Sequence, residues 1–178
     1  SLPLVAEDLG DLTPAVHELR VQFGLPGMRV LQFGFDGGDD NPHEPERITG
    51  DCICYAGTHD NNTTLGWLNE LSAQQVESLR QRYPAESPTG LVDHILNEVL
   101  ASPAELAVLT MQDLLMLPAE ARFNTPGTVG DNWCWRAGDD DLSPELAKAL
   151  LDRSTSAGRL RMPLETEAPT ALEFMAQR

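Results

Sequence analysis

The chain has 178 residues, of which 41% are hydrophobic and 22% charged, a composition typical of one globular domain with a buried core. Its formal net charge of −16 argues against nucleic acid and anionic membranes as partners, because both require a basic surface. No stretch approaches the ~20 consecutive apolar residues of a membrane span, and the composition suits a neutral partner such as a carbohydrate.

The first half of the chain alternates strand-like and helix-like segments. Residues 2–6 form an apolar run that ends in polar residues, which predicts a short buried strand. A Thr-Pro pair and a glycine bound the amphipathic segment 14–23, which predicts a helix. A second strand is predicted over 28–35. The polar stretch 36–51 after it predicts a long loop, which in compact domains is usually functional or mobile.

The second half continues the same alternation. A third strand is predicted over 52–56, and apolar residues recur at helical spacing from 63 to 83. An apolar helix is predicted over 89–101 and a fourth strand over 106–111. A loop rich in proline and glycine then leads to a last helix over 143–156, which a Ser-Pro pair introduces.

Strands that alternate with helices predict right-handed βαβ units and a parallel sheet. Each predicted strand carries its polar residues just past its carboxyl end, which is where (β/α)8 barrels place their chemistry. We therefore predict an α/β fold in which about four strands form half of a TIM barrel with helical insertions. A small doubly wound α/β domain is the alternative, and it would also gather ligands at the carboxyl ends.

Two of these strand ends carry side chains suited to chemistry. Glu7 and Asp8 follow the first predicted strand, and His59 and Asp60 follow the third. In a barrel these ends converge on one pocket, and paired carboxylates are what the cleavage of a glycosidic bond requires. A Glu-Asp pair at a strand end is also a common loop or capping feature, so the residue types alone leave catalysis open.

Three sequence blocks carry a resemblance to a known family. The first is Val5-Ala6-Glu7-Asp8-Leu9-Gly10 with Thr13-Pro14 and Phe23-Gly24-Leu25-Pro26-Gly27-Met28. The second is Gly57-Thr58-His59-Asp60-Asn61 with Thr63-Thr64-Leu65-Gly66-Trp67, and the third is Asn124-Thr125-Pro126-Gly127-Thr128 with Asn132-Trp133 and Trp135-Arg136. In order and spacing these blocks closely resemble the 4-α-glucanotransferase family of amylomaltases, or disproportionating enzymes, as far as about residue 160.

The resemblance implies roles for particular residues. Glu7 would be the general acid/base, and Asp60 would be a second catalytic carboxylate that holds the distorted sugar through its hydroxyls. His59 would donate a hydrogen bond to the same sugar. Four further sugar contacts are predicted on softer grounds, with Asx turns as the alternative for the asparagines: Asn61, Gln112, Asp113 and Asn124.

Several other residue types favour structural interpretations. The tryptophans could stack on sugars, but their spacing is more typical of packing: Trp67, Trp133 and Trp135. The acidic loop residues lack EF-hand spacing, so no metal is predicted at Asp36, Asp39, Asp40 or Glu44. Three histidines are predicted to lie on the surface: His17, His43 and His94. The odd cysteine count and the absence of a framework spacing indicate reduced thiols and a cytoplasmic setting: Cys52, Cys54 and Cys134.

The resemblance also implies a domain organisation, in which residues 1–162 form the C-terminal half of the catalytic barrel and 163–178 a tail. In this family the nucleophile is an aspartate at the end of the fourth barrel strand, and this chain begins at the fifth. We therefore expect the isolated chain to lack transferase activity. The N-terminal segment is not expected to be a signal peptide, because it has no basic region.

The function that the resemblance implies is transfer of α-1,4-glucan segments between maltooligosaccharides, with glucose as a further acceptor, by a retaining mechanism without a cofactor. The expected partners are these glucans, the missing N-terminal half of the barrel and, through exposed strand edges, further copies of the chain. Two alternatives stay open: a noncatalytic α-glucan-binding module and a retaining α-glucosidase that hydrolyses its substrate.

Overall fold

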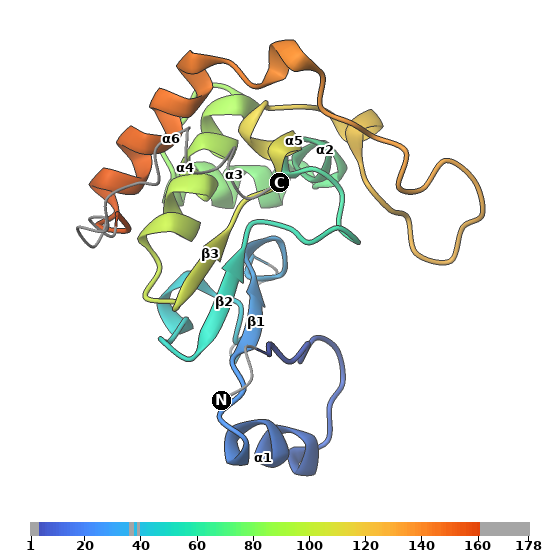
Figure 1. Cartoon of the computed structure of the whole chain (residues 1–178), viewed down its shortest axis with the longest axis vertical. Coiled ribbons are helices and arrows are strands. Elements are labelled where there is room, and N and C mark those ends of the chain that lie inside the picture. Colours follow the sequence, from blue (N-terminus) through green and yellow to red (C-terminus); the bar gives the residue numbers. More distant parts are fainter. Residues whose placement is uncertain (1–3, 36–37, 39, 161–178) are drawn as a thin grey trace, which may run out of the picture.

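The computed structural model describes residues 4–35, 38 and 40–160, and in this part of the chain the sheet has three strands in the order β1-β2-β3. These are β1 (Gly27–Val30), β2 (Cys52–Tyr55) and β3 (Leu106–Val108). Both pairings are parallel, with Met28 opposite Ile53 and Ile53 opposite Leu106. The predicted parallel sheet is therefore confirmed. Figure 1 shows the three strands side by side, with one helix beyond their lower end and most of the helices above them.

Most of the helices begin at or next to a position where the sequence predicts one, but the helix at Met111–Leu114 was not predicted. They are α1 (Pro14–Gln22), α2 (Thr64–Glu70), α3 (Ala73–Arg82), α4 (Pro88–Ala101), α5 (Met111–Leu114) and α6 (Pro144–Ser156). Short 3-10 turns lie at Leu31–Phe33, Pro45–Arg47, Ala119–Ala121 and Asp139–Asp141. In α2, α3, α4 and α6 a side chain accepts a hydrogen bond from a first-turn amide and so satisfies part of the free N–H groups: Thr63, Ser72, Ser87 and Ser143.

The prediction of about four strands is not confirmed, because the described part of the segment 2–6 is extended but belongs to no strand. Among its described residues, the Ala6 N–H donates a hydrogen bond to the carbonyl of Pro26, the residue just before β1, at 2.9 Å. Leu4 and Val5 are 52% and 45% exposed, so the predicted burial of this run was also wrong. An apolar run becomes a buried strand only when neighbours cover both its edges and its faces.

Two other predicted strands end earlier than expected. The segment 28–35 leaves the sheet after Val30, where a 3-10 turn begins. The segment 106–111 leaves it after Val108, because the Thr110 hydroxyl accepts a hydrogen bond from the Asp113 N–H and so caps α5. The residues that follow β3 are therefore helical rather than part of an open loop.

The core lies between one face of the sheet and the helices above it. Cys52 and Cys54 are 1% and 0% exposed and share this face. They pack with a row of apolar side chains on α4: Leu91, Val92, Ile95, Leu96 and Val99. Burial raises the pKa of both thiols, that of Cys54 to about 11. No helix in the described residues is both long and apolar enough to cross a bilayer.

A cavity of about 1420 Å³ lies against the edge of the sheet, and we call it the apolar cleft. Its apolar lining comes from the extended N-terminal segment, the end of α1, β3 and α6: Leu4, Val5, Phe23, Leu106, Leu109 and Leu150. Phe23 is 67% exposed and Leu106 is 51% exposed. Apolar side chains thus remain open to solvent beside the sheet, and not only within the core.

Candidate active site

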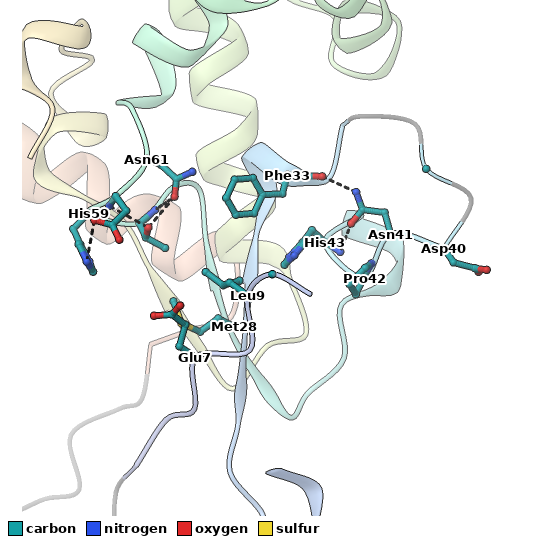
Figure 2. Close-up of a pocket in the computed structure, with 14 residues that line it drawn as sticks. Glu7, Leu9, Met28, Phe33, Asp40, Asn41, Pro42, His43, His59 and Asn61 are labelled. Atoms are coloured by element: carbon teal, nitrogen blue, oxygen red, sulfur yellow. Dashed lines mark hydrogen bonds and ion pairs between the residues drawn. The ribbon is translucent and has the colours of Figure 1, made fainter. Parts of the chain in front are cut away.

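A pocket of about 730 Å³ lies beside β1 and past the carboxyl ends of β1 and β2. Its lining comes from three stretches of chain, from β1 and from the 3-10 turn that follows β1: Glu7, Leu9 and Gly10; Met28 and Phe33; Gly38, Asp40, Asn41, Pro42 and His43; and Thr58, His59, Asp60 and Asn61. Figure 2 shows the turn of residues 58–61 on one side, Asn41 and His43 on the other, and Glu7 and Met28 below and between them. The pocket thus gathers Glu7, His59 and Asp60, three of the four residues predicted at strand ends, but not Asp8.

Glu7 is exposed and lines this pocket from the extended N-terminal segment. Its two neighbours in the chain hold the segment against β1. The Ala6 N–H donates to the Pro26 carbonyl at 2.9 Å, and the buried Asp8 carboxylate accepts from the Met28 N–H at 2.6 Å. The Glu7 carboxyl therefore reaches the pocket from a backbone that is tied down on both sides.

The side chain of Asn61 closes the 58–61 turn. Its Oδ1 accepts from the Thr58 N–H at 2.9 Å and from the Thr58 hydroxyl at 2.8 Å. The Asn61 N–H in turn donates to the Thr58 carbonyl at 3.1 Å. These bonds support the Asx-type role that was the alternative for Asn61, while a sugar contact from Asn61 stays a prediction. The turn presents His59 and Asp60, whose side chains are half exposed, with His59 Nε2 3.4 Å from Asp60 Oδ1.

A segment from far along the chain holds Asp60. The Asn124 amide donates to Asp60 Oδ1 at 2.6 Å, and the Arg122 guanidinium donates to the Asp60 carbonyl at 2.6 Å. Arg122 also donates to the Asn124 carbonyl at 2.8 Å. Asn124 was predicted as a sugar contact, and the structure brings it to the predicted catalytic carboxylate. Arg122 was missed, because it is 62 positions from Asp60 and no local pattern signals the contact.

Gln112 and Asp113, both predicted to bind sugar, are 2% exposed and are not among the residues that line the pocket. Asp113 accepts from the Thr64 N–H at 2.6 Å and from the Thr64 hydroxyl at 3.0 Å, and so fixes the first residue of α2. Burial raises the pKa of the Asp113 carboxyl above its ordinary value. Gln112 donates to the Ala121 carbonyl at 3.2 Å. The structure therefore gives both residues a supporting position behind the 58–61 turn, and sugar contact stays a prediction.

The tryptophans differ in their surroundings. Trp67 packs against the core and lies 5.9 Å, ring to ring, from Phe35. Trp133 is half exposed, its ring lies 5.1 Å from that of His59, and its backbone has φ 64. That conformation is uncommon for a bulky residue and is held only where surrounding contacts determine it; here the Trp133 N–H donates to the Phe123 carbonyl at 2.7 Å. Stacking of these rings on sugar stays a prediction.

His43 does not lie freely on the surface as predicted. Its ring is half-buried and lines the pocket, Nδ1 accepts from the Val30 N–H at 3.2 Å, and the ring lies 5.5 Å from that of Phe33 in an edge-on arrangement. His94 is also half-buried and stacks on Tyr83 at 5.8 Å. The rings of His43 and His94 each lie beside an aromatic ring, and the sequence around them does not reveal these contacts.

Acidic residues of the 36–51 loop pair with arginine where the structure describes them. Asp36 and Asp39 lie outside the described residues. Asp40 and Glu44 form ion pairs with Arg47 at 3.3 and 2.9 Å. Within the described residues, no group of three or more His, Cys, Asp or Glu side chains could hold a metal ion.

A parallel α/β fold with its polar side chains gathered past the strand ends is the arrangement of α/β enzymes. The family model for 4-alpha-glucanotransferase matches residues 1–140. The 4-alpha-glucanotransferase of Streptococcus pneumoniae is 41% identical over 160 residues, which cover 89% of this chain and 32% of that protein. That of Thermus thermophilus is 42% identical over 169 residues, which cover 89% of this chain and 33% of that protein.

Solved structures lead to the same family. An amylomaltase from Streptococcus agalactiae, solved in complex with acarbose, matches with a TM-score of 0.84 and 33% identity. The match covers 90% of this chain and 33% of that one. The chain belongs to the 4-alpha-glucanotransferase family, and it spans about a third of the length of the relatives it matches.

Proposed function

We propose that this chain is the C-terminal half of a (β/α)8 barrel that transfers α-1,4-glucan segments between maltooligosaccharides with retention of configuration. The observation that carries the proposal is the pocket, which brings Glu7, His59 and Asp60 together although they come from separate stretches of chain. Membership of the family supports the reaction. The barrel as a whole requires the part of the relatives that this chain does not match.

Glu7 is the general acid/base of the proposed reaction. Its carboxyl proton passes to the glycosidic oxygen as the bond to C1 breaks, and the nucleophile, an aspartate supplied by the N-terminal half, forms a bond to C1. The Glu7 carboxylate then takes the proton of an acceptor hydroxyl, whose oxygen displaces the nucleophile. One glycosidic bond is broken and one is formed, and Glu7 regains its proton.

Asp60 stabilises the positive charge that develops on the sugar ring and binds hydroxyls of that sugar. The Asn124 amide supports this role, because its hydrogen bond at 2.6 Å holds one carboxylate oxygen in place and leaves the other available. His59, 3.4 Å from the same carboxylate, donates to a hydroxyl of the same sugar. No cofactor or metal takes part in this mechanism.

The apolar cleft is the surface on which we place the N-terminal half of the barrel. The exposure of Phe23 and Leu106 supports this position, because large apolar patches on a lone domain mark an interface. When that half is absent, the same side chains favour association between copies of the chain.

A substitution of segments tests the function. The chain replaces the matching third of the Streptococcus pneumoniae enzyme, and the chimera is assayed for disproportionation of maltotriose. We expect a ladder of longer glucans, a loss of at least about a thousandfold with Glu7→Gln or Asp60→Asn, and no turnover by the isolated chain. Turnover that survives Glu7→Gln would disprove the assigned acid.

The same assay separates the alternatives. Production of mainly glucose would indicate a hydrolytic α-glucosidase. A folded chimera that binds acarbose, the ligand bound in the Streptococcus agalactiae structure, without turnover would indicate a binding module. A cytoplasmic setting stays a proposal that the free thiols support, whereas the name of the rice relative places that protein in the chloroplast or amyloplast.

A further inference from the structure

Asp8 directly follows Glu7 in the chain but has the opposite surroundings. Its side chain is 4% exposed and does not line the pocket, so it cannot touch substrate there. Its carboxylate accepts from the Met28 N–H at 2.6 Å and from Arg29 Nη1 at 3.3 Å. Arg20 Nε lies 3.4 Å away as an ion pair without hydrogen-bond geometry. A buried carboxylate with one amide and two guanidinium partners is fixed in place.

The sheet makes room for this carboxylate. Gly27, the first residue of β1, faces Asp8 so closely that an added Cβ would lie 2.3 Å from Asp8 Oδ2. Carbon and oxygen atoms that are not bonded to each other cannot approach to that distance, so any side chain at position 27 would displace the Asp8 carboxylate. The glycine is required by close approach, since its own φ is not in the left-handed region.

From Leu4 onward, where the structure describes it, the segment that carries Glu7 has few other attachments. The Ala6 N–H donates to the Pro26 carbonyl just before β1, and Leu4 and Val5 are exposed. The Asp8 carboxylate therefore supplies the second anchor, one residue from Glu7 on the other side. A segment held at one point can pivot, whereas a segment held at two points presents the side chain between them in one direction.

We infer that Asp8 is a positioning residue for Glu7, which it aims at the glycosidic oxygen through its contacts with Met28, Arg29 and Arg20. The inference rests on the proposed role of Glu7. The inference predicts a specific loss of proton transfer. When the acid is misplaced, the cleavage rate should fall most for leaving groups that need a proton and least for those that leave as stable anions.

The test uses the full chain in the Streptococcus pneumoniae chimera. Asp8→Asn keeps an acceptor for the Met28 N–H and removes the charge that pairs with the arginines. We expect turnover of maltotriose to fall about thirtyfold to a hundredfold. The initial burst of fluoride from α-maltotriosyl fluoride should stay within about threefold, since fluoride departs with little help from an acid. Gly27→Ala, which leaves Asp8 itself intact, should produce the same split.

One control and one replacement variant complete the test. Asp51→Asn removes the other carboxylate near Arg20, 3.9 Å away and 66% exposed, and should leave both activities within about twofold. If Asp8→Asn lowers the yield of folded protein, Arg29→Met carries the test, because it leaves the Met28 N–H bond intact and should show the same split. Equal losses on both substrates, or no loss on either, would overturn the inference.

The failure of the proposed function would look different. Glu7→Gln would then retain maltotriose turnover, or the unsubstituted chimera would be inactive while correctly folded. If Glu7→Gln abolishes turnover and both Asp8→Asn and Gly27→Ala leave it unchanged, the function stands and the positioning role of Asp8 is wrong.

Discussion

Removal of the Asp113 carboxylate should destabilise the fold around the start of α2. In Asp113→Ala, the Thr64 N–H and hydroxyl lose acceptors at 2.6 and 3.0 Å in a site where Thr64 is 0% exposed and no solvent replaces them. Each buried polar group left without a partner costs about 1–3 kcal/mol, so for the two groups we expect unfolding to become easier by about 2–6 kcal/mol. That is a large part of the about 5–15 kcal/mol that holds a typical domain together.

The pH dependence of this effect has a definite sign. Burial raises the folded-state pKa of Asp113 above 3.8, so folding favours the protonated form. The contribution of Asp113 to stability is therefore fully present below the unfolded pKa and is lost as the pH rises through the folded pKa. Asn at this position keeps an acceptor and cannot ionise, so the gap between Asp113→Asn and the unsubstituted chain should be smaller at pH 7 than near pH 4.

Urea unfolding of the full chain, followed by tryptophan fluorescence at both pH values, measures these differences. The exposed Asp131→Ala is the matched control and should change the free energy of unfolding by less than about 0.5 kcal/mol. A cost for Asp113→Ala no greater than that of the control would refute the supporting role of this carboxylate. A gap between Asp113→Asn and the unsubstituted chain that widens toward pH 7 would refute the sign of its pKa shift.

Three further predictions concern the site, the cleft and the core. Asn124→Ala removes the 2.6 Å hydrogen bond to Asp60 and should lower maltotriose turnover of the chimera about tenfold to a hundredfold, whereas Asn97→Ala should not change it. The isolated chain should self-associate at micromolar concentration, as measured by light scattering, and Leu106→Asp in the apolar cleft should make it monomeric. Self-association that persists in Leu106→Asp would contradict a role for the apolar cleft. At pH 8 Cys54, with a pKa of about 11, should have only about 0.1% thiolate, so that iodoacetamide modifies the exposed Cys134 first by mass spectrometry; equal rates would contradict the burial of Cys54.

The helices were predictable because their start signals are local. Ser87-Pro88 and Ser143-Pro144 join a capping hydroxyl to a residue whose φ suits the first turn, and α4 and α6 begin at those prolines. The prediction of a buried strand at 2–6 had no such local signal, and the described part of this segment belongs to no strand. The apolar residues of this segment favour burial, but distant parts of the fold decide whether other residues cover them.

The residues of the candidate site were also predictable only in part. His59 and Asp60 were predictable because polar residues past parallel strands meet at one edge of the sheet. Glu7 lines the same pocket from a segment whose described residues belong to no strand, so the strand-end argument does not explain its position. For Gln112 and Asp113 the same reasoning did not lead to the pocket, since α5 begins directly after β3 and turns both side chains into the interior. The contact between Arg122 and Asp60 joins segments that have no signal in common, so only the folded structure reveals it.

The close approach of Gly27 to Asp8 has an evolutionary consequence. A side chain at position 27 and a carboxylate at position 8 exclude each other sterically, so position 27 cannot gain a side chain while Asp8 stays as it is. Family members that carry the aspartate should therefore also carry the glycine, and a lineage with a side chain at position 27 should have lost the aspartate and acquired another means of fixing the adjacent glutamate. Variation at these two positions should be correlated even where overall identity is low.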